Sequence, residues 1–265
     1  VPKEKIVVLG GIEFTRGIQG NCRLQHLTIR QAKGHDPMVY GVRGRSSFTM
    51  KDVVVEQCGT GVFASGTGVV GRCIDVEVRQ CAWNGIIASH GGSIRLVGAK
   101  TTVHHNCTNR RSDVYGLKLG SSSSSTIQLV SPLTKEIVFT DNGGGGNWGR
   151  CDGGDIDYQI KTIADTSSPV VHVVASGETK TTSTRSPAPF DSNVVVRVPE
   201  DCSTLDEAVE KVHGDNCLTT IVVGKGDHQI DSTHLVIRSV MNIVGDPELA
   251  KEEVVVMGGI KFAEG

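Results

Sequence analysis

Apolar and polar residues alternate along two neighbouring stretches of the chain, 46–66 and 69–91. Val53 and Val55 fall on one side of the alternation and Val54 and Glu56 on the other, which is the period of a strand rather than of a helix. The second stretch repeats the first, because VVVEQC (53–58) returns as VEVRQC (76–81) and GVFAS (61–65) returns as GIIAS (85–89). A self-match at about 23 residues predicts a solenoid in which each repeat stacks on the next.

The same pattern extends on both sides of these stretches. Leu27 and Ile29 align with Val53 and Val55, so the coils begin before residue 30. Within 93–120, His104 and His105 take the places of Arg79 and Gln80. Short strands joined by tight turns predict an all-β chain folded as a parallel β-helix.

Composition divides the chain into three parts. Residues 1–164 carry the coils, and 165–193 are rich in Ser, Thr and Pro, which is typical of a linker. In residues 194–265, Thr204 to Glu207 form a capping box that opens a short amphipathic helix with Leu205, Ala208, Val209 and Val212 on its apolar face. This part therefore predicts a strand, a capping helix and the first coils of a β-helix.

The end of the sequence repeats its beginning. KEEVVVMGGIKFAEG (251–265) aligns without gaps on KEKIVVLGGIEFTRG (3–17). The match indicates a tandem array, a permuted order of coils, or a boundary that falls inside an array. Because an uncovered solenoid end exposes apolar side chains and strand edges, we expect 194–250 to stack beneath 3–30, within the chain or on a neighbour. Self-association through the solenoid ends is one of the outcomes that this duplication allows.

The strand, the helix TLDEAVEKV, the segment TTIVVGKGDHQI and coils of the VVVEQCGTGVFAS kind together resemble the pectate-lyase-like superfamily of right-handed parallel β-helices. The resemblance implies that the short helix caps the N-terminal end of a solenoid. It implies no single function, because that superfamily includes lyases, hydrolases, epimerases and non-catalytic domains.

Charge and cysteine content narrow the picture. The net charge of −2 predicts no strong attraction to nucleic acid, and no apolar run approaches the ~20 residues of a membrane span. The sequence does not identify the cellular compartment, and an extracellular or cell-surface location is compatible with it.

Of eight cysteines, Cys58 and Cys81 fall at equivalent positions of neighbouring coils, where we expect buried thiols. Cys202 and Cys217 flank the predicted helix and are the better candidates for a disulfide.

Two sets of residues are candidates for a functional site. Residues one coil apart, Arg30, Glu56, Arg79 and His104, form an outward column that alternates in charge, which predicts either cross-strand pairing or a polar groove for a sugar chain. The binding candidates are Arg30, Glu56 and Arg79 from this column, together with Tyr115 from the loop beside it. The densest set of groups able to exchange protons is the second, with His104, His105, Arg110 and Asp113 as catalytic candidates.

The resemblance implies that such groups abstract a proton beside a uronate carboxylate, often with Ca²⁺ held by clustered carboxylates. Those clusters are missing from consecutive coils here, so no metal site and no cofactor is assigned. Asp141 to Asn147 could offer oxygens to Ca²⁺, although a Gly-rich corner explains the segment as well. The first hypothesis is a non-catalytic β-solenoid module, structural or carbohydrate-contacting, that could assemble end to end. The alternative is a polysaccharide lyase or epimerase acting on acidic glycans.

Overall fold

The computed structural model of the protein describes residues 6–18, 22–31, 40–120, 124–164, 195–215, 217–246 and 254–263. The predicted linker, 165–193, lies outside these ranges. Within them, short parallel strands form two sheets of fourteen and nine strands, here called sheet A and sheet B. The expected all-β solenoid, a parallel β-helix, is confirmed.

Sheet A contains two rows of short strands, and two long strands run through both rows. The first row consists of β1 (Ile6–Leu9), β4 (Thr28–Arg30), β7 (Val54–Glu56), β10 (Glu77–Arg79), β13 (Thr102–His104) and β16 (Phe139–Thr140). The second row consists of β2 (Ile12–Phe14), β5 (Tyr40–Gly44), β8 (Thr60–Ser65), β11 (Ile86–Ser89), β14 (Leu117–Leu119) and β17 (Trp148–Arg150). The long strands are β21 (Gly226–Ile237) and β23 (Val254–Phe262).

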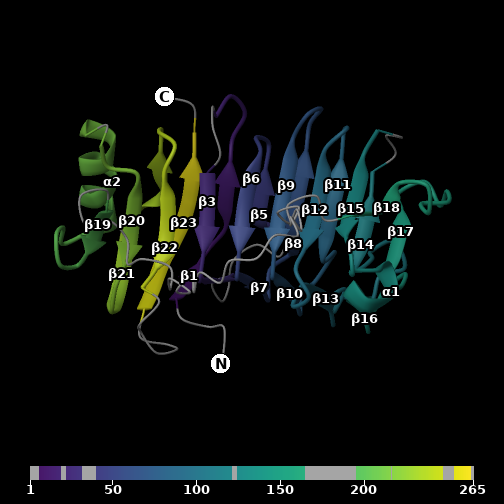
Figure 1. The fold of residues 1–265 in the computed structure, drawn as a ribbon. Helices are drawn as coiled ribbons and strands as arrows, with labels where there is room; N and C mark the ends of the chain where they lie inside the picture. Colours follow the sequence, from purple (N-terminus) through teal and green to yellow (C-terminus); the bar gives the residue numbers. More distant parts are fainter. Residues whose placement is uncertain are drawn as a thin grey trace, which may run out of the picture.

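Sheet B is a single row of strands. In spatial order its strands are β19 (Val195–Val198), β20 (Thr220–Val223), β22 (Asn242–Gly245), β3 (Cys22–Gln25), β6 (Phe48–Lys51), β9 (Val70–Ile74), β12 (Ser93–Val97), β15 (Thr126–Val130) and β18 (Ile160–Ile163). The helices are α1 (Lys135–Val138) and α2 (Leu205–Gly214). Figure 1 shows the levels side by side along one axis.

The register of the sheets follows the repeat that is visible in the sequence. Val55 pairs with Val78, and Val78 pairs with Val103 in the next strand. All three side chains are fully buried, as alternation in a strand requires. After β7, β10, β13 and β16 the chain turns through a residue with positive φ, namely Gln57, Gln80, His105 and Asp141.

The C-terminal part stacks beside the N-terminal coils of the same chain. Strand β22 pairs with β3, and β23 pairs with both β1 and β2 (Figure 1). The ring of Phe14 stacks on Phe262 at 4.7 Å and on Phe48 at 5.1 Å between centroids. One apolar core therefore runs through the junction between the two ends of the sequence.

Helix α2 covers the end of the solenoid next to β19. Thr204 is its N-cap and accepts a hydrogen bond from the Glu207 amide, while the Glu207 carboxylate accepts two from Ser203. These bonds lower the pKa of Glu207. The four apolar residues expected to face inward are buried. At the opposite end, no strand in the described part of the chain pairs with the outer edges of β16, β17 and β18.

All eight cysteines are free thiols. Cys58 and Cys81 are buried, as expected. The candidate bridge between Cys202 and Cys217 is not formed, because both are free thiols, with Cys217 exposed and Cys202 half-buried at the edge of the core. Burial raises the pKa of Cys73 to about 12, so that thiol stays protonated near neutral pH.

Candidate functional site

The predicted column of alternating charge on sheet A is a connected set of ion pairs. Glu56 is only 2% exposed, and its carboxylate accepts hydrogen bonds from Arg30 Nε at 2.7 Å and Arg79 Nε at 2.8 Å. Arg79 also reaches Glu77, with 3.0 Å between Nη1 and Oε1. Two guanidinium groups thus compensate one buried carboxylate, which is what a structural role requires.

The two histidines extend this column by one level. His104 Nε2 lies 3.1 Å from Glu77 Oε1, and His104 Nδ1 lies 2.7 Å from His105 Nδ1. If His104 donates from Nε2 to the carboxylate, its Nδ1 is the acceptor for His105. This arrangement leaves the Nε2 lone pair of His105 available as a base. Glu77, which sequence reasoning missed, orients the pair; it stands two residues before Arg79, on the same side of β10.

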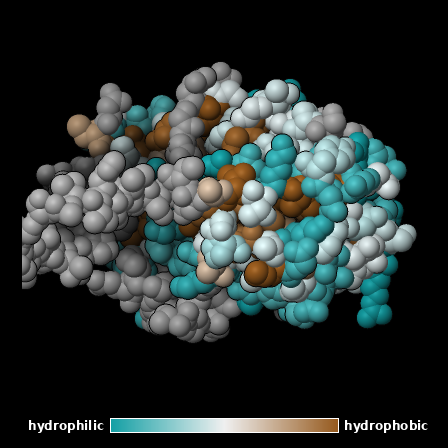
Figure 2. Space-filling view, turned by 45° about the vertical axis from the view of Figure 1, so that its right-hand side comes forward, coloured by the Kyte–Doolittle hydropathy of each residue, from teal (hydrophilic) through white to brown (hydrophobic). Residues whose placement is uncertain are grey.

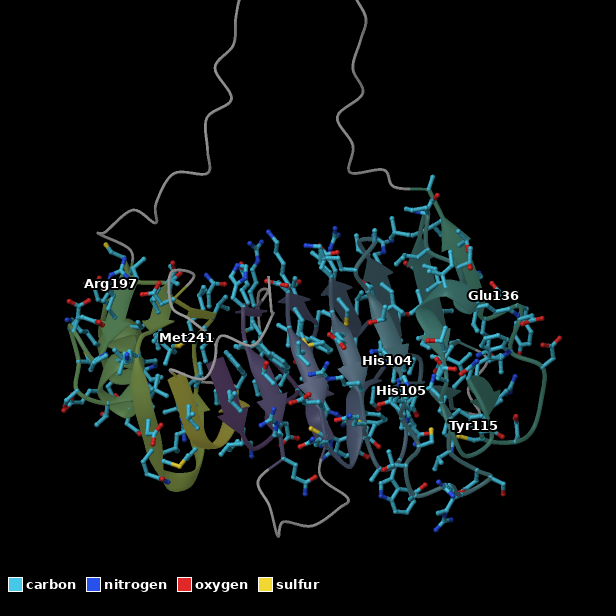
Figure 3. The ribbon with its side chains drawn as sticks, turned by 90° about the horizontal axis from the view of Figure 1, so that it is seen from below. His104, His105, Tyr115, Glu136, Arg197 and Met241 are labelled. Atoms are coloured by element: carbon cyan, nitrogen blue, oxygen red, sulfur yellow. The ribbon has the colours of Figure 1, made fainter. Side chains whose placement is uncertain are left out.

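The other catalytic candidates do not join the histidines. Arg111 pairs with Asp113 at 3.0 Å between Nε and Oδ1, which lowers the pKa of Asp113, and both side chains are more than half exposed. No hydrogen bond or ion pair among the described residues connects Arg110 or Asp113 to His104 or His105. Tyr115 packs its ring against Gly145 and Gly149, away from the two histidines (Figure 3). The expected acid–base cluster therefore reduces to His104 and His105.

Asn106 has a structural role. Its side chain is buried, donates to the Val78 carbonyl oxygen and the Asn142 amide oxygen, both at 3.0 Å, and accepts from the Cys81 amide. Asn142, in the Gly-rich segment considered for Ca²⁺, donates in turn to the Val103 and Thr140 carbonyl oxygens. These amides fix a corner of the solenoid. No group of three His, Cys, Asp or Glu side chains suited to a metal occurs in the described ranges.

Sheet B carries a second row of charge, which sequence reasoning missed. One column of positions on its outer side, one per strand, is in register and runs Val195, Thr220, Asn242, Arg23, Thr49, Arg72, Arg95, Gln128 and Lys161. The first two of these, Val195 and Thr220, are buried. The next column adds Arg197 and Lys51, and its remaining members are apolar apart from Gln25. Neither column contains an Asp or Glu. We call these six Arg and Lys residues the basic face.

Two arginines of the basic face are direct neighbours. Arg72 pairs in register with Arg95, so about 4.8 Å separates their backbones. Arg95 donates to Gln128 Oε1 at 2.9 Å, and no ion pair within the described ranges neutralises Arg23, Arg72 or Arg95. Two carboxylates that directly follow strands of sheet B, Asp52 after β6 and Asp75 after β9, have other partners. Asp52 pairs with His26 at 2.9 Å, and Asp75 accepts from the Lys100 amide at 3.2 Å.

A cavity of about 410 Å³ lies at the uncovered end, between α1 and β18; its lining is Leu129, Thr134, Lys135, Glu136, Asp157, Ile160 and Thr162. Lys135 bridges to Asp157 at 2.5 Å and lies over the Trp148 ring. Figure 2 turns this end forward and shows apolar residues between hydrophilic ones. The Lys135 ammonium and the Asp157 carboxylate neutralise each other, so Glu136 is the one unbalanced charge in the lining and leaves little net charge to select a ligand.

Comparison of the chain with models of protein families, with curated proteins and with solved structures finds no match. No helix in the described ranges is long and apolar enough to cross a membrane. The class that the fold defines is thus a parallel β-solenoid, and its function has to be argued from its own residues.

Proposed function

We propose that this protein is a non-catalytic β-solenoid module that binds an acidic carbohydrate along the basic face of sheet B. The observation that carries the proposal is the contrast between the two charged rows. On sheet A, carboxylates alternate with guanidinium groups, whereas on sheet B Arg72 stands beside Arg95 without a carboxylate. The resemblance to pectate-lyase-like β-helices, many of which contact polysaccharides, supports it as an analogy.

Like charges in directly paired positions destabilise a sheet. Folding gains nothing from placing two arginines there, and a bound polyanion would turn this repulsion into attraction. A row of cations with hydroxyl neighbours such as Ser93 and Thr126 suits a polymer that repeats both carboxylate and hydroxyl groups. Guanidinium groups are well suited to carboxylates because they donate two parallel hydrogen bonds.

An acidic glycan explains this face better than a nucleic acid does. Single-stranded nucleic acids are held by aromatic side chains that stack on bases as well as by cations. The outward columns of sheet B contain no aromatic residue in the described strands.

Binding of polygalacturonate, measured by calorimetry at two salt concentrations, tests the proposal. We expect binding that weakens with salt, and we expect Arg72→Gln/Arg95→Gln to weaken it at least tenfold. The matched control, Arg16→Gln/Lys211→Gln, removes the same charge from exposed positions outside sheet B and should bind like the wild type. Equal loss in both double variants, tighter binding of single-stranded DNA, or no binding at low salt would each refute the proposal.

A second candidate, a lyase or epimerase acting on uronate glycans, rests on the array of Glu77, His104 and His105. In it the His105 imidazole would take the proton beside the uronate carboxylate, while His104 and Glu77 position the ring. A lyase would generate absorbance from an unsaturated product, and an epimerase would change the sugar composition seen by NMR. Activity that His105→Gln abolishes while binding persists would establish this candidate over a purely binding function.

A further inference from the structure

Sheet A has one more level than sheet B where the ends of the sequence meet. In sheet B, β20, β22 and β3 are consecutive neighbours. In sheet A, β21 is followed by β23, then by β1 with β2, and only then by β4. Each of β21, β23 and β4 continues from its own sheet B strand, namely β20, β22 and β3. The pair β1–β2 has no such strand in the described part of the chain.

The two segments at this place are equivalent in sequence and in structure. β23 and β1–β2 are the copies of the duplicated segment, and they pair in register from Ile6 with Val254 to Phe14 with Phe262. One is the continuation of β22 and the other leads into β3. Sheet B advances by one level from β22 to β3, whereas sheet A advances by two, from β23 through β1–β2 to β4, so one of the two copies is in excess.

Charge distinguishes the two copies. Glu13 of β2 faces β5, with its carboxylate 3.7 Å from Arg43 Nη1 and 4.0 Å from Arg45 Nε. The equivalent residue of β23 is Lys261, which pairs in register with Glu13. If β23 replaced β2, Lys261 would face the two arginines. If β23 left, Glu13 would keep them and β1–β2 could close directly on β21.

We propose that residues 254–263 are a surplus strand, which the solenoid can release without opening and which can occupy the same level in a second copy of this chain. Val256, Ile260 and Phe262 are almost fully buried, so the released strand requires another apolar site. The only described surface with matching register is the gap between β21 and β1, and every copy presents it. When two copies exchange this strand reciprocally, every strand pair of the solenoid is kept. In dilute solution the closed monomer is favoured, because the covalent link to its own chain keeps the strand at a high effective concentration beside its own site.

Deletion of residues 254–265 tests whether the strand is surplus. We expect the shortened chain to unfold cooperatively, with a midpoint within about 5 °C of the full chain. Deletion of residues 1–17 should be more damaging because it leaves Lys261 beside Arg43, and Lys261→Glu in that background should restore stability. An unfolded Δ254–265 chain, or equal damage from both deletions with no rescue, would overturn the proposal.

Disulfide trapping tests where the strand goes, in a background in which the exposed Cys151 and Cys217 are serine. Gln229, Met257 and Leu9 are successive positions of one column. In the variant Gln229→Cys/Leu9→Cys the two cysteines are two levels apart in the full chain, so their backbones are separated by about 9.6 Å, which is too far for a disulfide. They should cross-link only when β23 leaves. Gln229→Cys/Met257→Cys should cross-link within one chain in dilute protein and between chains after refolding at high concentration. Cross-links confined to single chains at every concentration would exclude exchange between copies.

Discussion

The buried carboxylate of Glu56 gives the sharpest prediction about what stabilises the stack. Glu56→Gln preserves size and shape but removes the charge that Arg30 and Arg79 share. Hydrogen bonds to charged groups contribute about 1.5–3 kcal/mol each, and here the gain is reduced because the arginines are 35% and 26% exposed and therefore screened. Allowing for this screening, we expect the variant to lose about 2 kcal/mol of unfolding free energy.

For a chain of this size, that loss lowers the midpoint of thermal unfolding by roughly 4 °C. The assay is thermal and urea unfolding followed by circular dichroism, with Glu13→Gln as control. Glu13 is more exposed and its ion pairs are longer, so its loss should amount to less than about 1 kcal/mol. A Glu56→Gln protein as stable as the wild type, or no less stable than Glu13→Gln, would refute the structural role of the sheet A column.

Three further outcomes are expected. Asn106→Ala should lower the unfolding free energy by about 2–3 kcal/mol in urea titrations, since it leaves buried backbone groups unpaired. Asn106-Cys107-Thr108 has the form of a glycosylation sequon, but because the Asn106 side chain is buried it should carry no glycan in folded protein from a secreting host. Thr204→Ala should remove about 1 kcal/mol through loss of the α2 N-cap, with Ser in its place nearly neutral. Near neutral pH a thiol reagent should modify the exposed Cys151 and Cys217 at once. Cys73 and Cys107 should react only on unfolding, because burial raises the pKa of each of these two thiols to about 12. Rapid labelling of Cys73 in native protein would contradict the packing.

The sequence predicts the solenoid well because its repeats are locally consistent. Alignment of Val55 with Val78 gives both the strand and its register, since a slip of one residue would turn the buried valines outward. The capping helix was predictable for the same reason, because Thr204 and Glu207 are a local signal.

The charged surfaces were harder to predict because they depend on pairing between coils. Glu77 becomes part of a site only when His104 lies one level above Arg79. The basic face was missed because Arg23, Arg72 and Arg95 fall in the less regular part of the repeat, and the absence of carboxylates is a property of a whole column. The duplication of residues 3–17 was visible in the sequence. The extra level of sheet A was not, because it is recognised only when the strand pairs of sheet A are compared with those of sheet B.

Arginine footprinting tests the central claim most directly. Native protein is treated with phenylglyoxal, with and without polygalacturonate, and modification is mapped by mass spectrometry. The account predicts that the polymer protects Arg72 and Arg95 on sheet B and leaves the reactivity of Arg30 and Arg79 on sheet A unchanged. Protection of Arg79 with unchanged labelling of Arg72 and Arg95 would place the carbohydrate on the other sheet and contradict the account.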